Sequence, residues 1–297
     1  MGVTDLPCGT AEELLNLLSP RGDALPAVSV PNQFLFRGHS NSCHKLLPSA
    51  HRIGAMIPLP HGPWEAKEIL SIGEQVEAER DSLLHFFKLA DQAGLHLPGD
   101  SPTLRKKLED VAASPIWPVE SLFSVMALAQ HHGLPTRLLD WSRNGAVAAY
   151  FAAKAAARKV KCDSPPLAGT QTLSVWALRS PGDYPKNCLP AQEREYGTSS
   201  LKIVTAPQSS NANLNAQKGI FTLLQLEPLN FSALFRRDPL DTLPFEPPLD
   251  FFHFTLPVAQ APRLLRLLAL DGICASTLFP GYNGVVDALK EQSYLWG

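Results

Sequence analysis

The sequence contains few of the residues from which disulfide frameworks and metal sites are built. Among its 297 residues are five cysteines at positions 8, 43, 162, 188 and 274, widely spaced and without a Cys-x-x-Cys pair. An odd number of scattered cysteines is typical of free thiols in a reducing compartment. We therefore expect a cytoplasmic protein without a disulfide framework, and we expect no bound metal.

Charge is also scarce, and neither sign dominates. Asp, Glu, Lys and Arg together make up 18% of the chain, and the formal net charge is −2. No global basic field exists to attract nucleic acid, although a local basic groove stays open as an alternative. The polar N-terminus lacks the pattern of a signal peptide, and the apolar helix expected around 263–269 contains two arginines and is too short to cross a bilayer. We expect no membrane partner.

Several nucleotide-binding and catalytic motifs are absent. The chain has no Gly-x-x-x-x-Gly-Lys-Ser/Thr loop, no Gly-x-Gly-x-x-Gly turn and no His-Glu-x-x-His helix. The segment at 38–42 reads Gly-His-Ser-Asn-Ser and resembles a nucleophile elbow, but it ends in Ser42 where the sharp turn needs glycine. These absences count against a P-loop nucleotidase, a zinc protease and a serine hydrolase.

The apolar patterns predict helices and strands in an irregular order. We predict helices at 10–19, 65–93, 104–112, 119–131, 144–161, 260–270 and 283–292, and strands at 33–38, 136–141, 172–178, 219–225 and 251–256. The order shows no regular alternation of strand and helix, which favours an α+β fold. We expect residues 1–29 to form an N-terminal helix and linker, and residues 30–292 one domain with a helical insert at about 64–130.

Two polar segments stand inside apolar surroundings. The first is Phe36-Arg37-Gly38-His39, where an arginine ends an apolar strand and Gly38 permits a close approach of backbone. A buried arginine needs an anion or a carboxylate. Arg37 is therefore either the clamp for a phosphate or carboxylate ligand, or one half of a structural pair with a residue such as Asp140.

The second segment, residues 130–142, reads Gln-His-His-Gly-Leu-Pro-Thr-Arg-Leu-Leu-Asp-Trp-Ser. Neighbouring histidines point about 100° apart on a helix, so His131 and His132 are poor joint metal ligands. The segment nonetheless gathers histidine, arginine, aspartate, tryptophan and serine around a Gly/Pro turn, and such turns often present functional groups from a rigid scaffold.

These segments resemble the FRG domain. The resemblance rests on the Phe-Arg-Gly of 36–38, on Leu-Pro-Ser at 47–49, and above all on the fourteen residues from Ala129 to Ser142. The helix beginning near 144 and the later segments at 216–221 and 272–280 fit the same family. The resemblance covers about residues 30–290.

A weaker resemblance, to ADP-ribosyltransferases of the Arg-Ser-Glu class, implies a mixed, mostly antiparallel sheet and an NAD site. Arg37 corresponds to the arginine that binds NAD phosphate, and Ser142 to the serine of the supporting strand. Gln217 lies near the expected Glu-x-Glu, but no glutamate stands there. Asp140 and a distant glutamate are both candidate replacements, and a site that binds without turnover stays open as a third alternative. The target would be a protein or a nucleic acid. A toxin or defence role would fit such a small transferase.

The resulting candidate residues divide into two groups. The candidate catalytic residues are His131, Asp140, Ser142 and Gln217, and the candidate residues for binding NAD or a related nucleotide are Arg37, Gly38, His132, Arg137, Trp141 and Tyr150.

Two other functions remain open from the sequence. In the first, the same residues form a structural polar network in a non-catalytic interaction module. In the second, His131 or His132 acts with Asp140 as the base of a hydrolase or nuclease. Trp141 and Tyr150 have rings suited to stacking on a base or nicotinamide, but aromatic residues flanked by apolar helix are more often packed in the core.

Overall fold

A computed structural model describes residues 2–19, 25, 33–65, 69–109, 116–162, 171–179, 198–205, 211–226, 231–245 and 249–295. Residues 110–112, the end of the helix predicted at 104–112, lie outside these ranges. The fold is α+β, as predicted, and its main sheet is mostly antiparallel.

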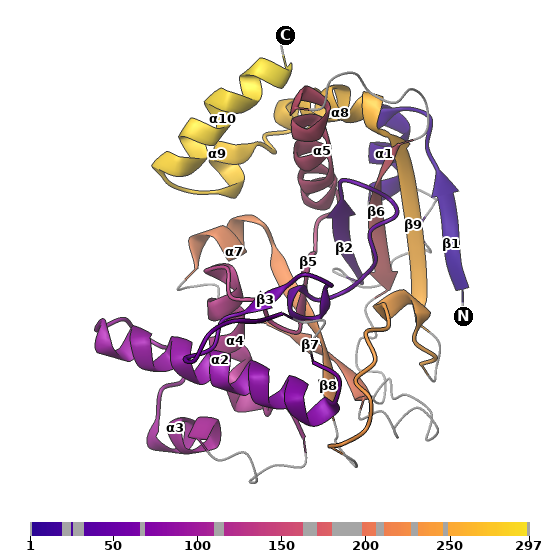
Figure 1. Ribbon diagram of the computed structural model, residues 1–297. Coiled ribbons are helices and arrows are strands. Elements are labelled where there is room, and N and C mark those ends of the chain that lie inside the picture. Colours follow the sequence, from indigo (N-terminus) through magenta and orange to yellow (C-terminus); the bar gives the residue numbers. More distant parts are fainter. Residues whose placement is uncertain are drawn as a thin grey trace.

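Seven strands form the main sheet in the order β1-β9-β6-β2-β5-β8-β7 (Figure 1). Their bounds are β1 (Gly2–Pro7), β2 (Phe34–His39), β5 (Leu138–Ser142), β6 (Thr172–Arg179), β7 (Thr198–Val204), β8 (Gly219–Leu226) and β9 (Asp250–Pro257). Every neighbouring pair is antiparallel except β1 with β9. The short strands β3 (Met56–Ile57) and β4 (Trp64–Glu65) pair separately.

The sheet is nearly divided in two at its centre. β2 pairs with β6 at six positions and β5 pairs with β8 at five, but β2 and β5 meet only where Phe36 lies opposite Ser142. We call β1-β9-β6-β2 the first half-sheet and β5-β8-β7 the second half-sheet. Because these two central strands pair at one position only, their facing edges are held together by other contacts.

Two groups of helices cover one face of the sheet. The first group, α1 (Ala11–Leu18), α5 (Gly145–Cys162) and α8 (Ala261–Leu270), packs on the first half-sheet through side chains such as Phe36 and Phe254. The second group, α2 (Ile72–Gln92), α3 (Pro102–Glu109) and α4 (Phe123–His131), packs on the second half-sheet through side chains such as Leu138. Phe36 lies opposite Ser142 and shares its face of the sheet. Alternate residues of a strand also share a face, so Leu138 lies on the same side as Ser142. Both helix groups therefore cover the same face of the sheet.

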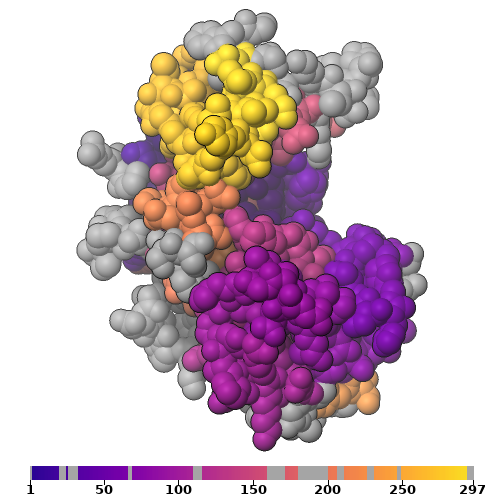
Figure 2. Space-filling model, turned by 90° about the vertical axis from the view of Figure 1, so that its left-hand side faces the viewer, coloured from indigo at the N-terminus to yellow at the C-terminus, as the bar shows by residue number. Residues whose placement is uncertain are grey.

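The short helices α7 (Ala212–Ala216) and α9 (Ala275–Leu278) and the final helix α10 (Tyr282–Leu295) complete the described helices. In Figure 2, α9 and α10 (yellow) lie above the second helix group (purple and magenta) on the face turned to the viewer. The opposite face of the sheet carries Leu35, Leu139, Trp141 and Trp176, packed against residues of the segment 240–249.

Local signals explain where the helices begin. The Thr10 hydroxyl accepts a hydrogen bond from the amide of Glu13, as the sequence predicts for the start of α1. Ser71 and Glu74 form a reciprocal capping box at the start of α2, seven residues later than the predicted start at 65. The helical insert expected at about 64–130 corresponds to α2, α3 and α4. The segment 1–29, expected to hold a helix and a linker, contributes α1 and also the edge strand β1.

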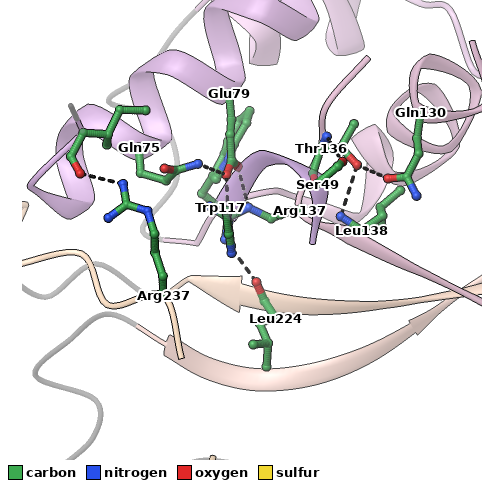
Figure 3. Close-up of polar contacts among 12 residues, drawn as sticks. Ser49, Gln75, Glu79, Trp117, Gln130, Thr136, Arg137, Leu138, Leu224 and Arg237 are labelled. Carbon is green, nitrogen blue, oxygen red and sulfur yellow. Dashed lines mark hydrogen bonds and ion pairs between the residues drawn. The ribbon is translucent and has the colours of Figure 1, made fainter. Parts of the chain in front are cut away.

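A buried carboxylate joins the second helix group to the sheet (Figure 3). The side chain of Glu79, on α2, is 4% exposed and accepts hydrogen bonds from Arg137 Nε at 2.5 Å, Trp117 Nε1 at 3.0 Å and Gln75 Nε2 at 2.5 Å. His51 Nε2 lies 3.4 Å from the same carboxylate. A buried charge is tolerated when its partners satisfy it in this way. The network therefore determines how α2 sits on the sheet.

We expect Glu79→Gln to lower the free energy of unfolding by about 3–5 kcal/mol, because it leaves the fully buried guanidinium of Arg137 without its counter-charge. Urea unfolding measures this change. The matched control is Glu109→Gln, which removes an exposed carboxylate 4.0 Å from Lys88 and is expected to cost less than about 1 kcal/mol. Equal effects of the two variants would contradict a buried ion pair.

The same network predicts acid sensitivity. Burial acts to raise the pKa of Glu79, but Arg137 and His51 outweigh it and lower that pKa from 4.5 to about 2. Burial lowers the pKa of His51 below its usual 6.5. Both folded-state pKa values are depressed, so both groups stabilise the fold at neutral pH. The stability that His51 contributes is lost as the pH falls below about 6.5. The stability that Glu79 contributes is lost as the pH falls from about 4.5 to about 2. Glu79→Gln should flatten the lower part of this profile.

Gly38 marks a close approach between β2 and α5. A Cβ atom built at this position collides with the carbonyl oxygen of Ala148 and lies 2.9 Å from the amide nitrogen of Ala152. Both obstacles are helix backbone, which cannot turn aside as a side chain can. The absence of a side chain at position 38 thus sets the distance between the helix and the strand.

We expect Gly38→Ala to destabilise the protein by about 1–3 kcal/mol or more, because α5 must move away from β2 to admit the methyl group. Thermal unfolding followed by circular dichroism tests this. The control is Gly2→Ala, whose methyl group meets open space and should leave the melting temperature unchanged. Gly133→Ala is unsuitable as a control because Gly133 has a positive φ.

Candidate functional site

A cavity of about 280 Å³ opens at the point where the two half-sheets meet. Its walls come from β2, β5 and α5 and from the residue before the turn into β8. The lining residues are Phe36, Arg37, Gly38, Asp140, Trp141, Ser142, Ala148, Phe151 and Gln217. Six of the ten candidate residues named from the sequence, namely Arg37, Gly38, Asp140, Trp141, Ser142 and Gln217, therefore border one cavity.

Arg37 bridges the two half-sheets at the cavity wall. Its Nη1 atom donates to the main-chain oxygen of Asp140 at 2.7 Å and lies 3.4 Å from the Asp140 carboxylate. Its side chain is 12% exposed, whereas that of Asp140 is 59% exposed. Burial lowers the pKa of the Arg37 guanidinium, and the charge of Asp140 opposes this effect. The pair therefore joins a largely buried cation to a solvated anion.

His39 supports Arg37 from the far side. Arg37 Nε donates to His39 Nε2 at 3.0 Å, so this ring nitrogen acts as an acceptor. Burial, followed by the positive charges of Arg37, His44 and Arg52, lowers the pKa of His39 to about 3. His39 is consequently neutral at physiological pH and does not compete with Arg37 for an anion.

Asp140 is held by a second side chain, which the sequence reasoning did not single out. Gln130, near the end of α4, donates through Nε2 to Asp140 Oδ1, and the hydroxyl of Thr136 donates to Gln130 Oε1. Thr136 Oγ1 in turn accepts from the amide of Leu138 at 3.1 Å. The position of Gln130 in the fourteen-residue motif was the available signal. Its role depends on the return of β5 beside α4, which a sequence alone does not reveal.

Ser142 and Gln217 lie together on the cavity wall, but both side chains are engaged in the fold. The Ser142 hydroxyl donates to the main-chain oxygen of Gln217 at 2.7 Å and accepts from the amide of Asn144 at 3.0 Å. Gln217 Nε2 donates to the main-chain oxygen of Leu278 at 3.1 Å and so links the start of β8 to α9. These contacts make Ser142 and Gln217 parts of the cavity wall and engage both side chains in holding the fold.

Trp141 borders the cavity, yet its indole ring faces the other side of the sheet. The ring packs in the cluster of Leu35, Leu139 and Trp176, and Nε1 donates to Thr222 Oγ1 at 2.8 Å. Neighbouring residues of a strand point to opposite faces, so Asp140 and Trp141 diverge. The proposed stacking of Trp141 on a base does not agree with this placement. Besides Trp141, the aromatic residues among those that line the cavity are Phe36 and Phe151.

Arg137 and Tyr150, two of the candidate nucleotide-binding residues, are buried and do not belong to the cavity lining. Arg137 is fully buried in the ion pair with Glu79, and its Nη1 donates to the main-chain oxygen of Leu224 at 3.1 Å (Figure 3). Tyr150 is 1% exposed and donates to Glu291 at 2.5 Å, and burial raises the pKa of its hydroxyl. Tyr150 lies on the inward face of α5, and Arg137, which directly precedes β5, is held in the core by Glu79.

His131 and His132 stand at the C-terminal end of α4, exposed to solvent and outside the cavity lining. Their rings contact each other edge to face, with centroids 5.2 Å apart. Burial of its ring and the neighbouring His132 lower the pKa of His131, while Asp140 acts in the opposite direction. The hydrogen bonds of the Asp140 side chain within the described part of the chain go to Gln130 and Arg37. This geometry gives the His/Asp hydrolase hypothesis no paired base.

Two further observations concern ligands and membranes. In the described ranges, no three residues among His, Cys, Asp and Glu are grouped so as to hold a metal ion. None of the helices that the structure describes is long and apolar enough to span a bilayer.

The unequal exposure of Arg37 and Asp140 predicts unequal effects of removing them. Asp140→Ala leaves a largely buried guanidinium without its carboxylate and should cost about 1–3 kcal/mol of unfolding free energy. Arg37→Met keeps the apolar stem and leaves an exposed carboxylate still bound by Gln130, so it should cost about 1 kcal/mol or less. Urea denaturation of both variants measures the difference, and a larger loss in Arg37→Met would contradict this asymmetry.

Comparison with known proteins identifies the segment that builds this site. No curated protein and no solved structure gives a significant match to the chain. The family model described as the FRG domain matches residues 32–161. That range contains β2, the second helix group, β5 and all of α5 except Cys162, and it includes every lining residue of the cavity except Gln217. Residues 32–161 therefore match the FRG domain, and the candidate site is built almost entirely within that range.

Proposed function

We propose that the cavity between the half-sheets binds the nicotinamide and ribose part of NAD, and that the protein is an ADP-ribosyltransferase-like domain. The observation that carries this proposal is the Arg37 guanidinium. It lies at the wall of a cavity that also offers a carboxylate and two aromatic rings. A cation for phosphate, an acceptor for ribose hydroxyls and an apolar surface for a base are the groups that a nucleotide requires.

The cavity volume limits how much of the ligand it encloses. About 280 Å³ is close to the lower end of the range of roughly 300–1,000 Å³ that small-molecule sites occupy. One base and one ribose suit that space, and the rest of a dinucleotide would extend towards the rim. The positive charge of Arg52 contributes to lowering the pKa values of both Arg37 and His39.

Asp140 is the group we assign to the chemical step. In the transfer, the bond from ribose C1′ to nicotinamide breaks, and neutral nicotinamide leaves with the electron pair. The acceptor then forms its bond to C1′ and loses a proton. Positive charge develops on the ribose, and a fixed carboxylate stabilises such charge. Asp140 lines the cavity, whereas position 217, near the expected glutamate, holds an uncharged glutamine. The acceptor would be a protein or a nucleic acid.

A non-catalytic module is the second candidate, and one observation favours it. Both oxygens of the Asp140 carboxylate already face donors, Gln130 on one side and Arg37 on the other. A carboxylate that is neutralised in this way is a weaker stabiliser of developing charge. The same cavity would then bind a nucleotide or a peptide carboxylate without turning it over.

A thermal-shift titration with NAD tests the proposal. At NAD concentrations of a hundred times the dissociation constant, the wild type should gain about 2.7 kcal/mol of stability. Arg37→Met should lose this gain while remaining folded. The matched control is Arg263→Met, which removes an exposed arginine bound to Glu12 at a distant surface and should retain the gain.

Parallel titrations with nicotinamide and with ADP-ribose show which part of the ligand binds. No shift with any of the three up to millimolar concentration would refute the nucleotide site. A shift without release of nicotinamide, even with cell extract as a source of acceptors, would favour the non-catalytic module. Release of nicotinamide that Asp140→Asn abolishes while NAD still binds would support the transferase.

A further inference from the structure

The Asp140 carboxylate is exposed, yet its orientation is constrained from two sides. Exposed carboxylates ordinarily rotate among many positions, because the terminal torsion of aspartate is broad. Here Gln130 Nε2 donates to Oδ1, and Arg37 Nη1 lies 3.4 Å from Oδ2. Each oxygen of Asp140 thus has its own partner, and each partner comes from a different element, α4 or β2.

The hydrogen bonds leading to Gln130 have only one consistent direction (Figure 3). An ionised carboxylate only accepts, so the contact with Asp140 Oδ1 requires the NH₂ group of Gln130 and leaves the amide oxygen of Gln130 for Thr136, whose hydroxyl also accepts from the amide of Leu138 at 3.1 Å. The Thr136 hydroxyl donates to Gln130 Oε1. With the amide oxygen occupied in this way, the NH₂ group of Gln130 is directed at Asp140.

The other end of this chain is anchored to the fold. Thr136 is 4% exposed, its amide donates to Ser49 Oγ at 3.1 Å, and Ser49 Oγ donates back to the Thr136 carbonyl at 3.2 Å. Thr136 directly precedes Arg137, whose ion pair with Glu79 is buried. The orientation of the Gln130 amide therefore derives from main-chain positions in the core rather than from solvent-exposed side chains.

We infer that Gln130 is a positioning residue that fixes the Asp140 carboxylate against Arg37, so that its remaining lone pairs serve a hydroxyl-bearing ligand. That the oriented carboxylate binds a ligand rests on the proposed function. The class of ligand is a compound that contains ribose. An ionised carboxylate offers about four acceptor positions, so two remain after Gln130 and Arg37 are bound. A glutamine supplies a donor to Asp140 without adding charge.

The test uses Gln130→Glu, which keeps the shape and the bond from Thr136 but replaces the donor to Asp140 by a like charge. In the wild-type background, we expect this substitution to lower the melting temperature by about 2–4 °C, which is the shift that a modest destabilisation causes in a protein of this size. The same substitution in an Asp140→Asn background should cause a clearly smaller fall. The matched control, Gln92→Glu, adds the same charge at an exposed position on α2. It should change the melting temperature by the same amount in both backgrounds.

The second readout is the dissociation constant for NAD. Gln130→Glu should weaken binding about tenfold, the factor of one charge-assisted hydrogen bond, and Gln92→Glu should leave it within twofold. If Gln130→Glu does not fold, Gln130→Met, which removes the amide and keeps the length, takes its place with the same expectation for binding.

The outcomes separate this inference from the proposed function. An equal fall in melting temperature in both backgrounds overturns the contact between Gln130 and Asp140. An unequal fall with unchanged NAD affinity overturns the positioning role and leaves a structural one. If the wild type binds no NAD, the proposed function fails, and the melting-temperature comparison alone decides whether Gln130 orients Asp140.

Discussion

The ion pair between Glu79 and Arg137 is the interaction on which the arrangement of the site depends. A carboxylate that is 4% exposed must be satisfied from all sides, and its partners come from α2, from the residue before β5, from a segment between these two elements and from a turn that precedes α2. Satisfying this one group places α2 and the start of β5 at a set distance. Thr136 precedes Arg137 and Asp140 follows three residues later, so their positions follow from the same anchor.

The near division of the sheet is the second constraint, and it creates the cavity. Had β2 and β5 paired along their whole length, backbone hydrogen bonds would fill the space that Arg37 now occupies. Gly38 brings α5 directly onto β2, and the bulk of α5 forms one wall with Ala148 and Phe151. A guanidinium, a carboxylate and two aromatic rings therefore meet at the junction of two half-sheets, each stabilised by its own helix group.

The fourteen-residue motif from Ala129 to Ser142 combines two kinds of residue that a sequence does not separate. Arg137 and Thr136 hold the fold, whereas Asp140 lines the cavity. All three are polar residues in apolar surroundings, which is why the sequence reasoning assigned Arg137 to a ligand. Which of them meets a ligand depends on residues far away, since the counter-charge of Arg137 is Glu79, 58 positions earlier.

Local patterns sufficed for what depends on neighbours in the chain. The α+β class, the central strand around Arg37, the helix that follows position 144 and the match of residues 32–161 to the FRG domain follow from periodicity, caps and a long contiguous motif. Tertiary structure alone decided that Trp141 turns away from Asp140 and that Gln130 reaches it. It also decided that β1 joins the sheet beside β9, some 250 residues later. These outcomes depend on strand register and on burial, and both are set by pairing partners that no local pattern specifies.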